Sequence, residues 1–139
     1  MKKILLISPN LKTTKDGKAR IQPSLALMSM ASVIREKYGH DVKILDTALL
    51  NWNNRKELAD GRTTEIGASN EEITTEIENY GPDVVASSVL FSNLFDSSLN
   101  IAGIVKEINP KTPVVLGGNH VSSSLGDYIY ARNNPDSNM

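Results

Sequence analysis

The chain has 139 residues, 40% of them hydrophobic and 22% charged, which is enough for one domain with one core. A net charge of −1 gives no argument for binding nucleic acid or an anionic membrane, and the apolar runs are too short to span a bilayer. Cysteine is absent, which excludes disulfides, cysteine-ligated metals and cysteine nucleophiles, so a cytoplasmic location is the default expectation.

The chain begins with a pattern that predicts a buried strand over residues 4–7. Two lysines precede this apolar run, as in a signal peptide, but the run is short and no small-residue cleavage site follows. Residues 11–22 are polar and form a long connection for a strand-to-helix link, which is either functional or a disordered surface loop. The charges in this segment, beginning with Lys12, are expected to be solvated.

A helix over 23–37 and a second strand over 42–45 follow. His40 lies at the turn between them, on the side opposite a ligand crevice, so a structural role is expected. The segment 47–70 is too long for a plain connection and is expected to be an insertion over the crevice, where Trp52 either covers a ligand or anchors packing. The remaining expected elements are a helix over 71–80, a strand over 83–90, a helix over 97–108, a strand over 113–116 and a helix over 124–130.

This alternation of strands and helices predicts an α/β fold with a parallel sheet and helices on both faces. Right-handed crossovers make a doubly wound sheet of the flavodoxin-like or Rossmann-like kind the natural closure. A flavodoxin-like sheet has the strand order 2-1-3-4-5, but only four strands are visible before the polar segment 133–139. We therefore expect a fragment of a longer protein, with an exposed sheet edge that can pair with another copy in a homo-oligomer.

The segment 113–124, with the sequence PVVLGGNHVSSS, is the first place to expect a ligand. A short apolar run suits a strand covered on both faces, and Gly117 and Gly118 then allow positive φ or a close approach to the backbone. Asn119 and His120 add polar groups where ligands sit in open α/β sheets, beyond the carboxyl ends of the strands. From these residues alone, a ligand loop and a structural turn both remain open.

Several short motifs occur together in a particular order. They are PSLAL at 23–27, GHDV at 39–42, GPDVV at 81–85, SVL at 88–90, VKE at 105–107 and the segment 113–124. Together they resemble the cobalamin-binding domain at the N-terminus of B12-dependent radical SAM enzymes. Each motif is weak alone, but the resemblance covers nearly all of residues 1–139.

The resemblance implies a pocket for the nucleotide tail of cobalamin, lined by a Ser-x-Leu after the third strand and a Gly-Gly after the fourth. The implied cofactor-binding residues are Ser88, Val89, Leu90, Phe91, Gly117, Gly118, Asn119 and His120. His120 either approaches the corrin edge or makes a hydrogen bond that fixes its loop. Many cobalamin-binding proteins carry Asp-x-His-x-x-Gly in the first loop, but residues 8–22 contain no histidine, so cobalamin bound here is expected to lack that lower ligand.

The resemblance also implies what lies outside this chain. Thiolates for a [4Fe–4S] cluster are absent, so the cluster and S-adenosylmethionine would belong to a radical SAM domain of the same parent chain. This chain would hold cobalamin without catalytic residues or metal ligands of its own, and the parent would transfer methyl groups.

Another flavodoxin-like ligand-binding or signalling module without cobalamin remains the alternative. A signalling receiver needs an acidic cluster directly after the first strand, and a flavin carrier needs a hydroxyl-rich phosphate loop there. Residues 8–10 are Ser-Pro-Asn, which is not acidic and is a poor phosphate loop. A hydrolase or transferase is not supported, because neither histidine has an evident nucleophile partner.

Overall fold

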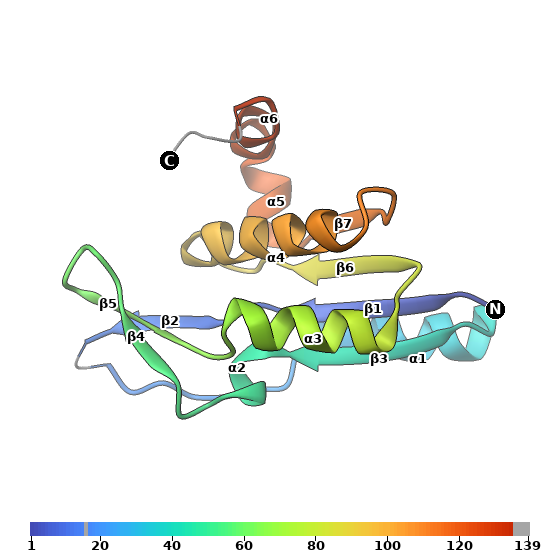
Figure 1. The fold of residues 1–139 in the computed structure, drawn as a ribbon, viewed down its shortest axis with the longest axis horizontal. Coiled ribbons are helices and arrows are strands. Elements are labelled where there is room, and N and C mark those ends of the chain that lie inside the picture. The colour runs from blue at the N-terminus through green and yellow to red at the C-terminus, as the bar shows by residue number, and fades with distance from the viewer. Residues whose placement is uncertain (16, 135–139) are drawn as a thin grey trace.

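The structure, a computed structural model, describes residues 1–15 and 17–134 and contains a central sheet of four parallel strands (Figure 1). The strand order is β3-β1-β6-β7, which corresponds to 2-1-3-4 when these strands are numbered along the chain. All neighbouring pairs are parallel, so the carboxyl ends of the strands meet at one edge of the sheet. The bounds are Lys3–Ser8 for β1, Asp41–Asp46 for β3, Val84–Ser88 for β6 and Val114–Gly117 for β7.

Helices cover both faces of this sheet, which confirms the doubly wound α/β class (Figure 1). Helix α1 (Leu25–Tyr38) packs on one face, and α3 (Asn70–Tyr80) and α4 (Phe95–Ile108) pack on the other. The Ser24 hydroxyl accepts a hydrogen bond from the Leu27 N–H at 3.3 Å and caps α1. The Ser69 hydroxyl accepts one from the Glu72 N–H at 3.2 Å and caps α3 in the same way.

The alternation of side chains along β1 divides the core in two. Leu5 and Ile7 point toward α3 and α4, where they pack with Ile77 and Ile101. Leu6 points to the opposite face, where it packs with Leu27 and other residues of α1. These three residues of β1 are fully buried, because the strand has a neighbouring strand on each side and helices on both faces.

A second, antiparallel sheet lies beyond the carboxyl ends of β1 and β3, and we call it the accessory sheet (Figure 1). Its strand order is β2-β5-β4, with bounds Leu11–Thr14 for β2, Arg55–Glu57 for β4 and Thr63–Ile66 for β5. The prediction that 11–22 is a loop throughout is therefore wrong for its first four residues. The partners of β2 lie far away in the sequence, with Leu11 paired to Ile66 and Thr14 to Thr63, so no local pattern reveals the pairing.

The accessory sheet and the short helix α2 (Thr47–Leu50) account for the irregular segment 47–70. Asp60 closes the turn between β4 and β5. Its carboxylate accepts hydrogen bonds from the Thr63 hydroxyl at 2.6 Å and from the Arg62 and Thr63 N–H groups at 2.8 Å. These hydrogen bonds, that of the Thr63 hydroxyl first, lower the pKa of Asp60 from 3.8 to about 2.

The carboxyl-terminal part differs from the prediction in two respects. The strand expected over 83–90 ends at Ser88, and a 3-10 turn, η1 (Ser92–Leu94), precedes α4. The polar run after Gly118 forms the short helix α5 (Asn119–Ser123), and the last helix, α6, spans Leu125–Asn133. These two helices project from the end of β7 and away from the sheet, so they cover little of it (Figure 1). Within the described residues, no helix has the length and apolarity needed to cross a membrane.

Candidate functional site

The structure brings the two predicted site motifs together at the carboxyl ends of β6 and β7. Ser88 is paired with Gly117, and each is the last residue of its strand. The next residue, Val89, ties the two exit loops together, because its N–H donates to the Gly117 carbonyl at 2.7 Å and its carbonyl accepts from the His120 N–H at 3.2 Å. Two motifs far apart in the sequence are therefore joined by backbone hydrogen bonds.

The two glycines have different roles in the fold. Gly118 has φ +107°, a conformation that L-residues rarely adopt, and a Cβ placed there would lie 2.6 Å from the Val89 carbonyl oxygen. Gly117 has no positive φ, and a Cβ placed there would meet no atom within 4 Å. Gly118 is therefore required by the turn itself, whereas Gly117 leaves open space beside the end of β7.

The first exit loop exposes apolar side chains. Leu90 and Phe91 are 53% and 62% exposed, although residues of this kind are usually buried. Ser88 is half-buried and shares a face of β6 with Ala86, on the side of the sheet that α1 covers. Val89 is fully buried, so it adds backbone hydrogen bonds but no exposed area to this site.

The second exit loop is held against α4. His120 lies in α5, and its ring meets the ring of Phe95 edge-on, with the ring centroids 5.7 Å apart and the planes at 79°. Its backbone N–H makes the hydrogen bond to Val89, and the role of the His120 side chain stays a prediction. Asn119 is exposed at the start of α5.

His40 lies at the opposite edge of the sheet, directly before the first residue of β3. The Lys2 N–H donates to His40 Nδ1 at 3.4 Å, beside the amino end of β1. The structural role predicted for this histidine therefore agrees with its position, far from the carboxyl ends of the strands.

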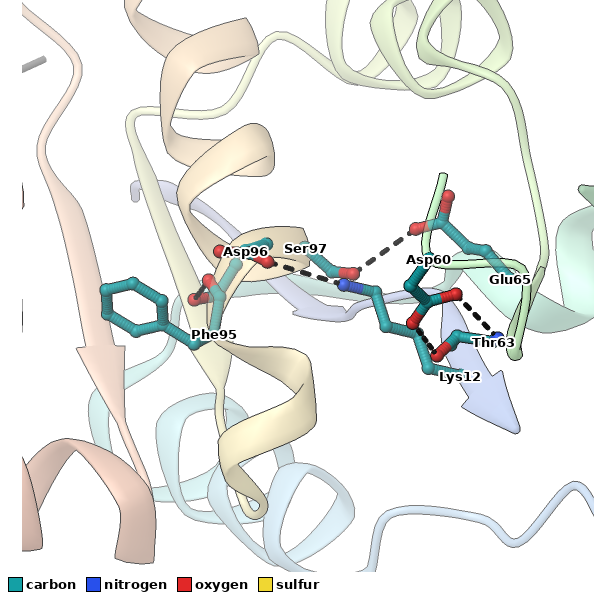
Figure 2. Close-up of polar contacts among 8 residues, drawn as sticks. Lys12, Asp60, Thr63, Glu65, Phe95, Asp96 and Ser97 are labelled. Carbon is teal, nitrogen blue, oxygen red and sulfur yellow. Dashed lines mark hydrogen bonds and ion pairs between the residues drawn. The ribbon is translucent and has the colours of Figure 1, made fainter. Parts of the chain in front are cut away.

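A polar cluster joins the accessory sheet to the first turn of α4 (Figure 2). Lys12 Nζ lies 3.8 Å from Asp96 Oδ2, and the Ser97 hydroxyl donates to Glu65 Oε1 at 3.3 Å. The side chain of Lys12 is only 11% exposed, so the prediction that its charge is solvated is wrong. Sequence reasoning missed this cluster because Lys12 and Asp96 belong to segments that only the fold brings together.

Two cavities lie close to the carboxyl edge of the sheet. One, of about 690 Å³, separates the accessory sheet from the start of α3 and has a polar lining that includes Asn10, Arg55 and Glu65. Asn10 Oδ1 is buried there without a hydrogen-bond partner, while its Nδ2 donates to the Ala68 carbonyl at 2.9 Å. The other, of about 400 Å³, is an apolar cleft between α1, α2 and the edge strand β3.

Trp52 lines neither of these cavities. It is half-buried, and the guanidinium carbon of Arg55 lies 5.6 Å from its ring centroid. This arrangement favours packing within the 47–70 segment, which was one of the two roles predicted for this residue.

The strand order and the parallel pairing place the domain in the flavodoxin-like class, in which ligands sit beyond the carboxyl ends of the strands. Comparison with known families identifies the ligand, because the model of the B12 binding domain matches residues 19–130. The chain belongs to this family, and its cofactor is cobalamin. The family resemblance predicted from the sequence motifs is thereby confirmed.

Two curated relatives are named as methyltransferases. The chain is 31% identical over 119 residues to the cytidylyl-2-hydroxyethylphosphonate methyltransferase of Streptomyces wedmorensis, with 85% of this chain and 22% of that protein covered. It is 32% identical over 122 residues to an uncharacterized methyltransferase of Pyrococcus horikoshii, with 88% of this chain and 22% of that protein covered. The chain thus spans about a fifth of the length of these curated relatives.

Proposed function

We propose that this chain holds cobalamin over the carboxyl ends of β6 and β7, as the cofactor-holding part of a longer B12-dependent radical SAM methyltransferase. The observation that carries the proposal is the pairing of Ser88 with Gly117, beside which the structure leaves open space. Cobalamin supplies the methyl-transfer chemistry, and the protein supplies its placement. The methyltransferase names of the two relatives support the reaction class.

The residues at this surface fit a large, partly apolar cofactor. Leu90 and Phe91 offer exposed apolar area, and the Ser88 hydroxyl offers a donor and acceptor. Gly117 lets the cofactor approach the backbone at the end of β7. Gly118, Asn119 and His120 would shape the second side of the site, and Val89 would keep both loops in register through its backbone.

The proposed cofactor has no histidine available from the first loop. Residues 8–22 contain none, and His40 lies at the opposite edge of the sheet. The ring of His120 packs against Phe95. We therefore expect that neither histidine of this chain would ligate the cobalt of a bound cobalamin. If the nucleotide tail enters the pocket, the base of the cofactor would also leave the cobalt, and the absorption spectrum would be base-off.

The surface beyond β7 suits a further part of a longer protein. β7 is an edge strand, and its central residue Val115 is 54% exposed. On α1, Met30 and Val33 are 45% and 50% exposed. A fifth strand and a helix of the parent chain would cover these groups. Alternatively, a second copy of the chain would pair with the β7 edge in a homo-oligomer. The [4Fe–4S] cluster and S-adenosylmethionine would belong to a separate radical SAM domain of that parent.

Retention of cobalamin tests the binding site directly. The purified chain is mixed with hydroxocobalamin, free ligand is removed by gel filtration, and the visible spectrum of the protein is recorded. Gly117→Val fills the open space at the end of β7 with a residue that strands favour, so it should abolish retention without unfolding the chain. Gly103→Val is the matched control, because a Cβ at this position of α4 also meets no atom within 4 Å.

The outcomes test the location of the site and the binding of cobalamin separately. Retention by the Gly103→Val variant and its loss in Gly117→Val support the site. Equal retention by both variants would refute it. If the 139-residue chain retains no corrin, the same test on a chain extended to the full parent decides the matter, and failure there would refute the proposed function.

A further inference from the structure

The first turn of α4 lies between the accessory sheet and the loop of residues 117–120, which we call the glycine loop. Consecutive residues of this turn face different partners. Phe95 contacts the ring of His120, whereas Asp96 and Ser97 contact the accessory sheet (Figure 2). A single helical turn therefore contacts both the accessory sheet and the glycine loop.

The contacts on the accessory-sheet side are partly shielded from water. Ser97 is 6% exposed and donates its hydroxyl proton to Glu65. The side chain of Lys12 is 11% exposed, whereas that of its partner Asp96 is 65% exposed. Lys12 and Glu65 are directly paired across β2 and β5, so both project from the same face of the accessory sheet. Ion pairs and hydrogen bonds of this partly buried kind are less screened than those on open surfaces.

The contacts on the glycine-loop side extend to the proposed site. Phe95 packs edge-on against His120, and the His120 N–H donates to the Val89 carbonyl. The Ser98 hydroxyl donates to the Phe95 carbonyl at 2.6 Å and anchors the same turn. Since Val89 also donates to Gly117, the turn, α5 and both exit loops form one connected set of contacts.

We propose that the accessory sheet positions the glycine loop through this turn, with Lys12, Ser97 and Phe95 as positioning residues. None of the three belongs to the proposed cofactor contacts. Residues in one contact network show coupled effects when they are changed, and this is the measurable consequence. The part of the inference that concerns cofactor affinity rests on the proposed function, whereas the coupling itself does not.

Amide resonances of the ligand-free chain test the coupling. Lys12→Met removes the charge but keeps most of the side-chain volume, and Ser97→Ala removes one hydroxyl. Both should shift the 1H–15N resonances of Gly117 and His120, and Lys12→Arg, which restores the charge, should return them toward the wild-type positions. Glu57→Gln is the matched control, because Glu57 pairs with Lys15 at 3.0 Å on the same accessory sheet, where both side chains are more than half exposed.

Visible titration with hydroxocobalamin then measures affinity. Lys12→Met and Ser97→Ala should raise the dissociation constant about three- to tenfold, a typical effect for coupled contacts, and Glu57→Gln should leave it unchanged. The change caused by Lys12→Met should become smaller when Phe95→Leu is already present, because the effect passes through that ring.

Each result has a defined meaning. Unshifted Gly117 and His120 resonances in folded Lys12→Met and Ser97→Ala proteins would overturn the inference, whatever the affinity. Shifted resonances with unchanged affinity would overturn the positioning role. Absence of cobalamin binding by the wild-type full parent would refute the proposed function, and the resonances would still decide whether the accessory sheet and the glycine loop are coupled.

Discussion

Replacing Gly118 with alanine should destabilise the fold, whereas the same change at Gly117 should not. At Gly118 the backbone has φ +107° and ψ 174°, a region occupied almost only by glycine, which costs other residues about 1–3 kcal/mol. The new Cβ would also lie 2.6 Å from the Val89 carbonyl oxygen, so the loop must shift and weaken the Val89 hydrogen bonds. We expect a loss of about 3 kcal/mol in the free energy of unfolding.

Thermal unfolding followed by circular dichroism measures this difference. For a domain of this length, about 3 kcal/mol corresponds to a decrease in Tm of about 10 °C. Gly117→Ala should leave Tm unchanged or raise it slightly, because alanine restricts the unfolded chain and its Cβ meets nothing in the fold. A Tm for Gly118→Ala within about 2 °C of the Gly117→Ala value would refute the assignment of separate roles to the two glycines.

Three further predictions concern other parts of the fold. Asp60 should titrate at about 2 by NMR, so the stability that its carboxylate gives the accessory sheet is complete above the usual value of 3.8 and is lost as the pH falls through about 2; Asp60→Asn should remove this acid dependence. Burial raises the pKa of Tyr80 above 10.0, and Asp41 adds to the effect. The stabilising contribution of the neutral phenol is therefore complete below pH 10.0 and is lost as the pH rises through the raised pKa. The absorbance of the phenolate, compared between the wild type and Tyr80→Phe, measures this titration. Gly67→Ala should lower Tm because φ is +144° and the new Cβ would collide with Asn10 Oδ1. The decrease should be smaller when Gly67→Ala is made in an Asn10→Ala protein, whereas an equal decrease in both backgrounds would exclude the collision as a cause.

The parallel sheet was predictable because its signals are local. Each central strand contains a short apolar run, such as residues 4–7, and helices α1 and α3 each begin with a serine cap. The accessory sheet was not predictable in the same way, because Lys12 and Glu65 read as polar loop residues until the fold pairs their strands. Long-range pairing of polar strands leaves no periodic apolar pattern in the sequence.

The candidate site was predictable as a location but not in its details. The order of the motifs placed Ser88 and Gly117 at neighbouring strand ends, where the structure pairs them. In the sequence the two glycines look alike. Only the structure shows that a Cβ on Gly118 would collide with Val89, whereas a Cβ on Gly117 would meet nothing. The run after Gly118 was expected to be a ligand loop or a structural turn because it is rich in serine and asparagine, yet it forms the short helix α5, whose His120 contacts Phe95.

The position of β7 at the edge of the sheet has a consequence for amide hydrogen exchange. β1 lies between two strands with both faces covered, so its amides exchange only when most of the domain opens. β7 has one neighbouring strand and an exposed central residue, so it opens at a smaller free energy. A cofactor bound across Ser88 and Gly117 would therefore slow amide exchange first in β7. Binding would raise the protection of this strand, the weakest of the site, toward that of the core.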